Sequence, residues 1–450
     1  MQLQLGRKPV LIISSAESAE EVLKKQDAVF ADRPKRAFDE KLLYNFRDVV
    51  FAPYGEYWRQ ARSICVLHLL NNKRVQSFRS LREEEVKQML EKIRESCLSG
   101  SSITVNVSEI LATYANDVVS MIAIGKRYSA EEGGNQFKEL FEDTTTLLGY
   151  FNVADFIPCL GWMNHINGME GKANRVAKAF DEYLEKVVDE GMQRLEKRVA
   201  SNDGESLEEK KVEEQNFVDV LLELQRNANA LDFSVDRDSV KAIILDMFVA
   251  GTNTTSALLE WAISELLKNS DAMKMLQNEV RNSLSGYLPD HITEDDLGKL
   301  PYLKAVIKET LRMHPPVAMI NRRTRNAVKV LGYDVEGATQ VLINAWAIGR
   351  DPLLWEQPDE FQPERFLKDR SVDFRGHHFE LIPFGSGRRI CPGIGFVTVT
   401  VELALANLIR NLDFALAGGA IPEELDMTEA HGIVMPRKVP LLLVPSLANN

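Results

Sequence analysis

One short segment constrains this chain more than any other: residues 383–395 read Pro-Phe-Gly-Ser-Gly-Arg-Arg-Ile-Cys-Pro-Gly-Ile-Gly. Its four glycines let the backbone turn tightly and approach a ligand closely. Cys391 follows Arg388 and Arg389 and precedes a predicted helix over 396–410. Cationic neighbours and a helix N-terminus both favour a thiolate over a thiol. An isolated cysteine is usually a small buried hydrophobe, but this setting favours a reactive or metal-bound thiolate.

Composition and charge narrow the class of protein further. The chain has 450 residues, 27% of them charged, and a formal net charge of −12, which is typical of a globular protein and disfavours nucleic-acid binding. Cys65, Cys97 and Cys159 are far apart and form no CxxC pair, so neither a zinc site nor a disulfide framework is indicated. The N-terminus has no signal-peptide pattern, and no uncharged apolar run reaches about 18 residues, so we predict no transmembrane helix.

Apolar periodicity predicts a mainly α chain with a smaller β region. The predicted elements, in order, are a strand over 10–14, a helix over 18–25, a largely helical region over 54–199, an exposed linker over 201–214, helices over 238–268 and 300–313, strands within 328–342 that turn at Gly332, and an irregular segment over 351–376. The region 144–169 is apolar but interrupted by glycine and proline. We interpret it as core plus loops and short helices, with an alternative in which it rests on a membrane or lines a ligand entrance.

The predicted helix over 238–268 contains a cluster of poor helix formers at 250–256, Ala-Gly-Thr-Asn-Thr-Thr-Ser. Glycine in a helix interior costs about 1 kcal/mol, and Ser, Thr and Asn compete for backbone hydrogen bonds. A close helix crossing at Gly251 would explain the cluster. A distorted helix that faces a ligand explains it better.

The pattern Phe384-x-x-Gly387-x-Arg389-x-Cys391-x-Gly393 resembles the haem-binding signature of the cytochrome P450 superfamily. The resemblance implies that Cys391 is the proximal ligand of the iron of haem b and that Arg389 pairs with a haem propionate. A thiolate ligand pushes electron density towards iron and favours O–O cleavage, and backbone N–H groups of a glycine-rich loop can tune its sulfur.

Glu309-x-x-Arg312, followed by Pro-Glu-Arg-Phe at 363–366, resembles the Glu-Arg-Arg triad of the same superfamily, with Arg365 as the third member. Alone, a Glu/Arg pair at this spacing is a surface contact that contributes about 0.2–0.5 kcal/mol. As a bidentate network it would lock the haem-side core rather than catalyse.

Two more motifs imply contacts to the haem propionates. Trp58 and Arg62 resemble the family's Trp-x-x-x-Arg, and this spacing places both side chains on one helix face. Arg322 matches a third propionate-side arginine of the family, although Asn321 stands where the usual proline would precede it.

The segment 250–255 resembles the family's oxygen-binding stretch. By this resemblance the Thr254 hydroxyl steadies bound oxygen and relays protons, and Gly251 leaves room beside the iron. Asn253 stands where the family has an acid. A carboxylate passes protons, whereas a carboxamide only orients water, so we expect slower or water-mediated proton delivery.

The segments 51–59 and 344–352 resemble the large plant microsomal class of the superfamily, and the resemblance extends over about residues 1–447. It implies one catalytic domain over 1–450 with the cytochrome P450 (haem-thiolate) fold. The implied activity is monooxygenation, in which one atom of O₂ enters a lipophilic plant metabolite such as a terpenoid, phenylpropanoid or indolic compound. Residues 3–14 already resemble the first strand of the fold, so we expect the membrane anchor and hinge of this class to be missing here. The expected location is the cytosolic face of the endoplasmic reticulum membrane.

The chain has no GxGxxG after a strand and no P-loop, so nothing indicates that it binds its own nicotinamide or flavin. The resemblance implies electrons from NADPH through NADPH-cytochrome P450 reductase. We expect its acidic face to meet a basic surface that includes Arg62, Lys73, Arg74 and Arg388.

The substrate-facing positions implied by the resemblance are all apolar, as a lipophilic pocket requires. They are Ile243, Met247, Ala250, Val317, Ala318, Met319, Ile320, Ile433 and Val434. Two other functions stay open at this point. Asn253 is compatible with a haem-thiolate dehydratase or isomerase that needs no O₂, and a haem-binding sensor or carrier would need no catalysis.

Overall fold

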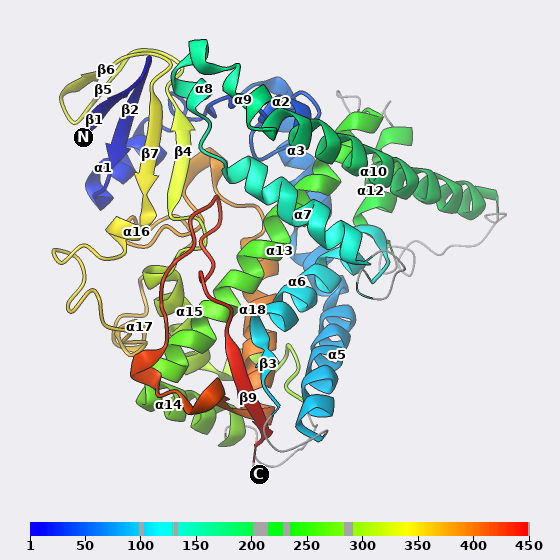
Figure 1. Ribbon diagram of the computed structural model, residues 1–450, viewed down its shortest axis with the longest axis vertical. Helices are drawn as coiled ribbons and strands as arrows, with labels where there is room; N and C mark the ends of the chain where they lie inside the picture. The colour runs from blue at the N-terminus through cyan, green and yellow to red at the C-terminus, as the bar shows by residue number, and fades with distance from the viewer. Residues whose placement is uncertain are drawn as a thin grey trace.

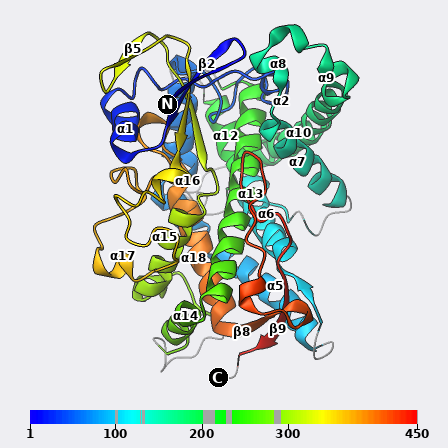
Figure 2. The ribbon, with the colours of Figure 1, turned by 60° about the vertical axis from the view of Figure 1, so that its left-hand side comes forward.

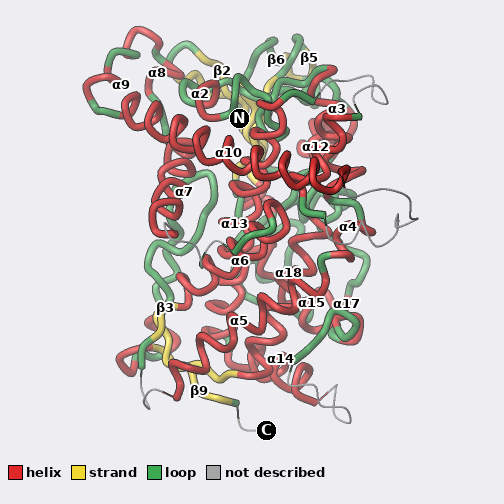
Figure 3. The backbone as a smooth tube through the Cα atoms, turned by 90° about the vertical axis from the view of Figure 1, so that its right-hand side faces the viewer, coloured by secondary structure: helices red, strands yellow, loops and turns green. Residues whose placement is uncertain are grey.

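The computed structural model describes residues 1–98, 103–127, 129, 134–200, 215–227, 235–282 and 291–448. The predicted linker over 201–214 lies outside these residues. Helices dominate the molecule, and the strands gather in two places, near the N-terminus and near the C-terminus (Figures 1 and 3). The expectation of a mainly α chain with a smaller β region is confirmed.

The largest sheet has four strands in the order β1 (Gln2–Leu5), β2 (Lys8–Ile13), β7 (Gln340–Asn344) and β4 (Met319–Arg323). β2 and β7 are parallel, and the other two pairs are antiparallel. A second sheet has the order β3 (Val105–Asn106), β9 (Leu442–Leu447) and β8 (Leu412–Leu416), and β5 (Val328–Val330) pairs with β6 (Tyr333–Val335). The first sheet therefore brings the N-terminal segment beside strands from the last third of the chain.

Seventeen α-helices are described. They are α1 (Ala16–Glu20), α2 (Asp39–Leu42), α3 (Glu56–Ile64), α4 (Asn72–Ser77), α5 (Arg79–Leu98), α6 (Val107–Ile124), α7 (Gly134–Gly149), α8 (Val153–Phe156), α9 (Met163–Ile166), α10 (Met169–Ala200), α12 (Phe217–Arg226), α13 (Arg237–Lys268), α14 (Ser270–Asn282), α15 (Pro301–Met313), α16 (Ala345–Ile348), α17 (Arg365–Lys368) and α18 (Ile394–Asn411). Short π-helical turns extend α1 and α3, over Glu21–Lys25 and Cys65–Leu69.

α13 runs through the middle of the molecule, with α6 and α18 beside it (Figures 1 and 2). The Asp236 side chain caps its start by accepting the Ser239 N–H, as an N-cap residue does. The helix is continuous across 250–256, so the expected distortion is wrong. The poor formers are tolerated because Thr254 and Thr255 return their hydroxyls to the carbonyls of Ala250 and Gly251, each at 2.6 Å.

Gly251 lies at a close crossing of α13 with α6. A Cβ atom at this position would come within 2.9 Å of Val119 Cγ2, closer than normal van der Waals contact. The same glycine also lines the main cavity of the molecule, described below. Gly251 therefore serves both the helix crossing and the ligand-facing wall, which the sequence offered as alternatives.

Most other predicted elements match the structure closely. The helix over 300–313 is α15, which has Pro301 in its first turn and stops before two prolines. The strands within 328–342 turn at Gly332, where φ is +90°. The helix over 396–410 is α18. Apolar periodicity did not predict β1, because it is a short edge strand whose side chains are largely exposed.

Three helices, α6, α13 and α18, are long and apolar enough to cross a membrane by length and composition, which the sequence reading overlooked. In this fold, 61%, 61% and 67% of their respective apolar windows are buried inside the protein. Their hydrophobicity serves the core, where Leu258, Ile263 and Leu403 are almost completely buried.

The apolar region 144–169 contains more helix than predicted, because its first residues are the end of α7. Beyond α7, the short helices α8 and α9 and a 3₁₀ turn over Pro158–Leu160 match the expectation of loops and short helices. Phe151, Trp162 and Ile166 are exposed by 65%, 56% and 77%, so this part of the region lies on the surface and not in the core.

Candidate active site

A cavity of about 300 Å³ lies between the middle of α13 and the cysteine-containing loop. Ala250, Gly251 and Thr254 line it from α13, and Phe384 and Cys391 line it from the loop. The wall consists mostly of apolar side chains, with a group of arginines to one side. Such a cavity is typical of a site for a large, mainly apolar ligand that carries a few charged groups.

Cys391 is held with its backbone N–H donated to the Phe384 carbonyl at 3.0 Å. Burial raises the pKa of its thiol, against the opposing effects of the Gly393 N–H and the Arg62 charge. Arg388 and Arg389, which the sequence reading invoked, hydrogen-bond to other groups. The loop alone therefore does not make a thiolate. A bound metal ion would, because a coordinating thiol is deprotonated by the ion's charge.

The loop glycines serve different purposes. Gly385 and Gly387 have φ of +70° and +69°, a region that disfavours other residues. A Cβ on Gly387 would lie 2.2 Å from the Leu23 carbonyl oxygen, so this glycine lets the loop pack against the N-terminal segment. Gly387 does not line the cavity. Gly393 does, and a Cβ there would be 3.8 Å from Cys391 Sγ.

Four arginines line one side of the cavity, and we call them the cavity arginines: Arg33, Arg62, Arg322 and Arg389. In the described part of the chain, their hydrogen bonds all go to backbone carbonyls. Arg389 donates to Ala31, Val49 and Ala52, at 2.9, 3.3 and 2.5 Å. Arg62 donates to Ile390 at 2.6 Å. Arg33 donates to Val50 at 3.0 Å and also to the Asn321 carbonyl. Within the described ranges, none of the four forms an ion pair with a carboxylate.

Burial lowers the pKa of each cavity arginine, that of Arg33 to about 10 and that of Arg389 to about 9, and repulsion from neighbouring arginines adds to the effect at Arg33, Arg322 and Arg389. Arg322 is 1% exposed, and its Nη2 is buried without a hydrogen-bond partner. Buried charge without a counter-ion is costly. The group therefore fits an anionic ligand, and two haem propionates supply bidentate acceptors of the required sign.

Trp58, on α3, lies among these arginines. The Arg389 guanidinium is 4.1 Å and the Arg62 guanidinium 5.6 Å from its ring centroid. Its indole N–H donates to the Val49 carbonyl at 3.0 Å. The structure thus brings together four residues that the sequence reading assigned to the propionates, Trp58, Arg62, Arg322 and Arg389.

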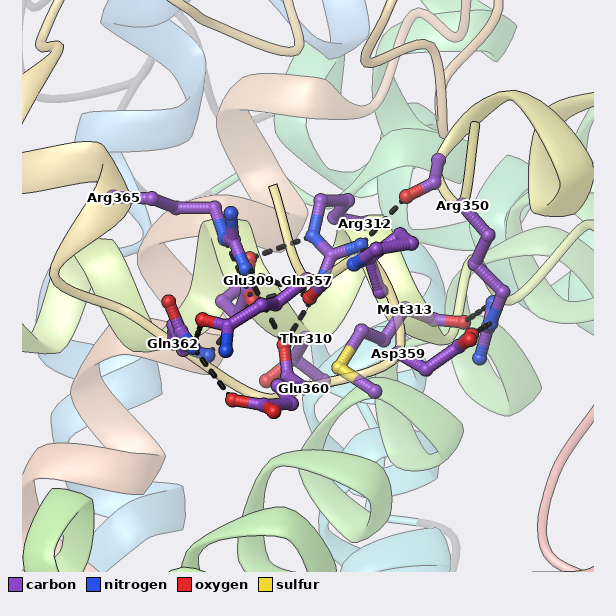
Figure 4. Close-up of polar contacts among 12 residues, drawn as sticks. Glu309, Thr310, Arg312, Met313, Arg350, Gln357, Asp359, Glu360, Gln362 and Arg365 are labelled. Atoms are coloured by element: carbon purple, nitrogen blue, oxygen red, sulfur yellow. Dashed lines mark hydrogen bonds and ion pairs between the residues drawn. The ribbon is translucent and has the colours of Figure 1, made fainter. Parts of the chain in front are cut away.

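Glu309, Arg312 and Arg365 form a closed network on the side of α15 (Figure 4). Arg312 donates to both carboxylate oxygens of Glu309 at 2.8 Å, and Arg365 donates to Glu309 Oε1 at 3.0 Å. The remaining Arg312 donors reach the carbonyls of Gly349, Pro358 and Glu360. None of the three lines the cavity, which agrees with a structural role.

Thr254 lines the cavity and Asn253, although only half-buried, does not. The Thr254 hydroxyl donates to the Ala250 carbonyl, which leaves its lone pairs free to accept. The Asn253 carbonyl accepts a hydrogen bond from Ser256 at 3.2 Å. The residue that departs from the family pattern therefore lies behind the wall and not in it.

Of the predicted substrate-facing positions, six line the cavity: Met247, Ala250, Val317, Met319, Ile320 and Ile433. Three do not. Ile243 is 1% exposed and packs in the main core, Ala318 is 5% exposed and its carbonyl accepts the Ala345 N–H, and Val434 is half-buried but does not line the cavity. The expectation was wrong for these three, because neighbours along a helix or loop point in different directions.

The sequence reading missed Arg33 and Asp246, which both line the cavity. Asp246 is 4% exposed and accepts the Val49 N–H at 2.5 Å. Burial and the nearby Asp48 raise its pKa well above the usual value, and burial raises the pKa of Asp48 to about 7. A lone acid inside the apolar stripe of 240–248 was the available signal for Asp246. No sequence feature near Arg33 indicated that this residue lines a cavity.

The predicted reductase-facing charges need a correction. Arg62 lines the cavity, and Arg74 is buried, with a hydrogen bond to the Gln215 carbonyl at 3.3 Å. Lys73 and Arg388 are exposed. Arg388 pairs with Asp27 at 2.8 Å.

The fold and the site define the class of protein as a haem-thiolate enzyme. Cys391 and Thr254 lie on the walls of one cavity, which is also lined by arginines that have no carboxylate partner among the described residues. A model of the family "Cytochrome P450" matches residues 1–444, and the chain belongs to this family. It is a cytochrome P450 monooxygenase of plant specialised metabolism. As a member of this family it contains haem and uses O₂.

Related proteins support this assignment. Cytochrome P450 736A117 of Prunus mume is 49% identical over 99% of this chain and 83% of its own length. The tabersonine/lochnericine 19-hydroxylase of Catharanthus roseus is 48% identical, over 99% of this chain and 85% of that protein. A zebrafish cytochrome P450 solved with abiraterone aligns over 100% of this chain and 96% of its own, with a TM-score of 0.80 at 21% identity, and shows the same fold.

Proposed function

We propose that this enzyme inserts one oxygen atom from O₂ into a lipophilic specialised metabolite, with electrons supplied by NADPH-cytochrome P450 reductase. The observation that carries the proposal is the arrangement of the cavity. Cys391 and Thr254 lie on its walls, together with four arginines that have no carboxylate partner among the residues that the structure describes. Most other wall residues are apolar, which suits a substrate with little hydrogen-bonding capacity.

Haem bound in this cavity would supply O₂ activation at a thiolate-ligated iron. The residues of the chain itself prepare the cavity for this chemistry. The Cys391 sulfur receives the Gly393 N–H, which tempers its electron donation. The cavity arginines would hold the propionates of the bound haem. Gly251 leaves space that any larger side chain would fill, because Val119 already closes the crossing behind it.

Proton delivery is assigned to Thr254. Its hydroxyl can turn from the Ala250 carbonyl towards the cavity, donate a proton there and accept one from water. Asn253 lies behind the wall, and its carboxamide only orients water. The supply of protons therefore runs through water next to Thr254.

The test is the spectrum of the reduced, carbon monoxide-treated protein. We expect the red-shifted band of thiolate ligation in the natural chain and its loss in Cys391→Ser. The matched control is Cys65→Ser, since Cys65 also lines the cavity and burial raises its thiol pKa to about 12. This variant should keep the band. An unchanged band in Cys391→Ser would place the iron ligand elsewhere and overturn the proposal.

The substrate class rests on the apolar wall and on related enzymes. Two relatives are named tabersonine/lochnericine 19-hydroxylase and (+)-menthofuran synthase, the second from Mentha piperita and 46% identical. We propose a terpenoid or an indolic compound as substrate, ahead of a phenylpropanoid. Compounds of the three groups are compared by the spin-state shift of the haem spectrum. A preference for small polar phenols would contradict the assignment.

A reaction without O₂, such as a dehydration or isomerisation, is the second candidate, favoured only by Asn253. It predicts turnover of the substrate under anaerobic conditions without NADPH. The monooxygenase predicts none. The hydroxylase among the relatives favours oxygenation.

We propose that the reductase docks on the cysteine side, where Lys73 and Arg388 are exposed. Lys73 lies on α4, and its neighbour Asn72 is 3.9 Å from where a Cβ on Gly395 would lie. Both charges are therefore close to the loop that holds Cys391. Exposed cations near the metal ligand suit an acidic partner and speed its association.

We also propose that the enzyme works on the cytosolic face of the endoplasmic reticulum membrane and rests on it through α8 and α9. Phe151, Trp162 and Ile166 are exposed apolar side chains in and beside these helices, and Phe151 stacks on Phe156 with ring centroids 5.0 Å apart. Isolated exposed hydrophobes are normal, but a group of aromatic and aliphatic side chains indicates an interaction surface. The test is sedimentation with phosphatidylcholine vesicles, in which Trp162→Ser/Ile166→Ser should bind less than the natural chain.

A further inference from the structure

The segment between β8 and β9 forms a long hairpin over residues 428–438. The Lys438 N–H donates to the Thr428 carbonyl and the Ala430 N–H to the Pro436 carbonyl, both at 2.8 Å. Figures 1 and 2 show this red segment running up along α13 towards the end of α7. The tip reaches the cavity, where Ile433 forms part of the wall.

The base of the hairpin is tied to two helices. The Trp261 indole N–H, from α13, donates to the Met435 carbonyl at 2.9 Å. The Met435 N–H donates to the Pro316 carbonyl, just after α15, at 2.9 Å. Arg437, buried at 6% exposure, donates to Ser264 Oγ at 2.9 Å. The position of the tip therefore depends partly on contacts with Trp261 and Ser264, which do not line the cavity.

Four side chains at this base form one polar group, which we call the His314 cluster: Trp261, Glu265, His314 and Glu429. His314 stacks on Trp261 with ring centroids 4.0 Å apart and an interplanar angle of 2°. Its Nε2 lies 2.7 Å from Glu265 Oε1, and its Nδ1 lies 3.2 Å from Glu429 Oε1. His314 and Glu265 are 6% and 4% exposed. The cluster thus joins α13, the end of α15 and the hairpin.

Both ring nitrogens of His314 face carboxylate oxygens, which have no hydrogen to donate when ionised. A neutral imidazole has only one N–H, so the cluster needs one further proton, on the ring or on a carboxyl group. The Trp346 indole N–H also donates to Glu429 Oε1, at 3.2 Å. Burial opposes ionisation of Glu429, but the contacts from His314, Trp346 and Arg350 outweigh it and leave its pKa below the usual value. Charge-assisted hydrogen bonds in a buried site hold their partners firmly.

His314 also begins a second part of the cavity wall. The next residues are Pro315 and Pro316, followed by Val317, Met319 and Ile320, and the last three line the cavity. One buried histidine therefore lies at the start of one wall segment and at the base of another. A shift of the ring would move both segments relative to α13.

We infer that His314 is a positioning residue that sets the width of the substrate cavity, by holding the hairpin 428–438 and the segment 315–320 against α13 through Glu265, Glu429 and Trp261. The inference rests on the proposed function only in that this cavity holds haem and substrate. His314 does not contact the substrate itself. It selects for substrate size through Ile433, Val317 and Ile320, so bulky ligands depend on it and small ones do not.

The experiment compares two azoles that bind haem iron through nitrogen, read from the absorbance shift of the haem-loaded protein. Imidazole needs only the space at the iron, whereas clotrimazole must contact the cavity wall. The main variant is His314→Phe/Glu265→Gln, which keeps a ring against Trp261 and leaves no unpaired buried carboxylate. We expect the clotrimazole Kd to rise about tenfold, which corresponds to partial loss of burial for one isoleucine-sized contact. The imidazole Kd should stay within about twofold, a difference worth well under 1 kcal/mol.

Two further variants separate positioning from general loss of stability. His314→Gln keeps a donor for one carboxylate, so it should restore part of the clotrimazole affinity. Asn407→Ala removes buried hydrogen bonds between α18 and Ile292, and should lower Tm without changing the ratio of the two Kd values. Equal changes for both azoles in the double variant, or the same change in Asn407→Ala, would overturn the inference. Failure of imidazole to shift the natural protein would instead refute the haem site and the proposed function.

Discussion

Two groups of buried arginines differ in how their charge is neutralised. In the Glu-Arg-Arg network, Arg312 and Glu309 have fully buried side chains and pair with each other at 2.8 Å, and Arg365 adds a second ion pair to the same carboxylate. The cavity arginines bury comparable charge, yet within the described part of the chain they have only carbonyl partners, apart from the unsatisfied Arg322 Nη2.

This difference separates a structural site from a binding site. A buried ion pair with complete hydrogen bonding can exist on its own, although removing one partner costs about 3–5 kcal/mol. Buried arginines without counter-ions oppose folding until an anion arrives. The Glu309 network therefore stabilises the protein itself, whereas the cavity arginines serve to bind the cofactor.

The largest expected effect comes from breaking the first group. Glu309→Gln removes the one carboxylate that, in the described part of the chain, pairs with Arg312 and Arg365, and it leaves two charges in the core. We expect destabilisation by about 3–5 kcal/mol, seen as a large drop in Tm and little or no protein with the red-shifted carbon monoxide band.

The control for this variant is the exposed pair Asp271 and Lys274, which has the same i, i+3 spacing in α14 and side chains exposed by 97% and 69%. Lys274→Gln should change stability by no more than about 0.5 kcal/mol. Similar Tm values for the two variants would show that the buried network is no stronger than a surface pair.

The next effect comes from the second group. Arg322→Leu should weaken haem retention, since a hydrogen bond to a charged group contributes about 1.5–3 kcal/mol, or about 10–100-fold in dissociation. The measurement is the rate of haem transfer to apomyoglobin. The haem-free variant should be at least as stable as the haem-free natural chain, because an unpaired buried charge is gone.

Arg312→Leu is the matched variant, since it removes an arginine of equal burial from the other group. It should destabilise the haem-free protein strongly, because Glu309 loses its bidentate partner. If Arg322→Leu lowered the Tm of the haem-free protein as much as Arg312→Leu does, the distinction between the two groups would fail.

The sequence identified both groups by short motifs, and the reason lies in their geometry. Glu309 and Arg312 are three residues apart in α15, so spacing along the chain predicts their contact. Arg365 lies 56 residues from Glu309, and only the resemblance to the family's Glu-Arg-Arg triad pointed to it. Trp58 and Arg62 are likewise one helical turn apart. Arg33 could not be found this way, because it comes from an irregular segment and meets Arg389 and Arg322 only in the folded chain. The same holds for Asp48 and Asp246, which are far apart in sequence.

The third prediction concerns these two buried acids, whose carboxyl groups interact with each other. The pKa of Asp48 is raised to about 7 by burial, so the folded state keeps protons that the unfolded chain releases near its usual value of 3.8. The free energy of unfolding therefore falls as pH rises from about 4 to about 7. Tm should be lower at pH 8 than at pH 6.

Asp246→Asn should reduce this pH dependence, since Asp48 then faces an amide instead of a second carboxyl group. The amide oxygen still accepts the Val49 N–H, so the loop should stay in place. Asp271→Asn, at a fully exposed position, is the control and should leave the profile unchanged. Parallel profiles for Asp246→Asn and the natural chain would argue against a shared, buried proton.

The smallest expected effect comes from two arginines that are neighbours in sequence, one of them exposed and the other in the cavity. Arg388 is exposed and pairs with Asp27, whereas Arg389 is a cavity arginine. Arg388→Gln should cost no more than about 1 kcal/mol of stability, as exposed ion pairs do, and haem retention should not change. Its effect should appear in the rate of reduction by NADPH-cytochrome P450 reductase at low salt, because a lost surface cation slows association.

Arg389→Gln should do the reverse and lose haem while reductase association persists. If both substitutions affected haem retention equally, burial and pairing would not be what divides the arginines of this protein into two groups.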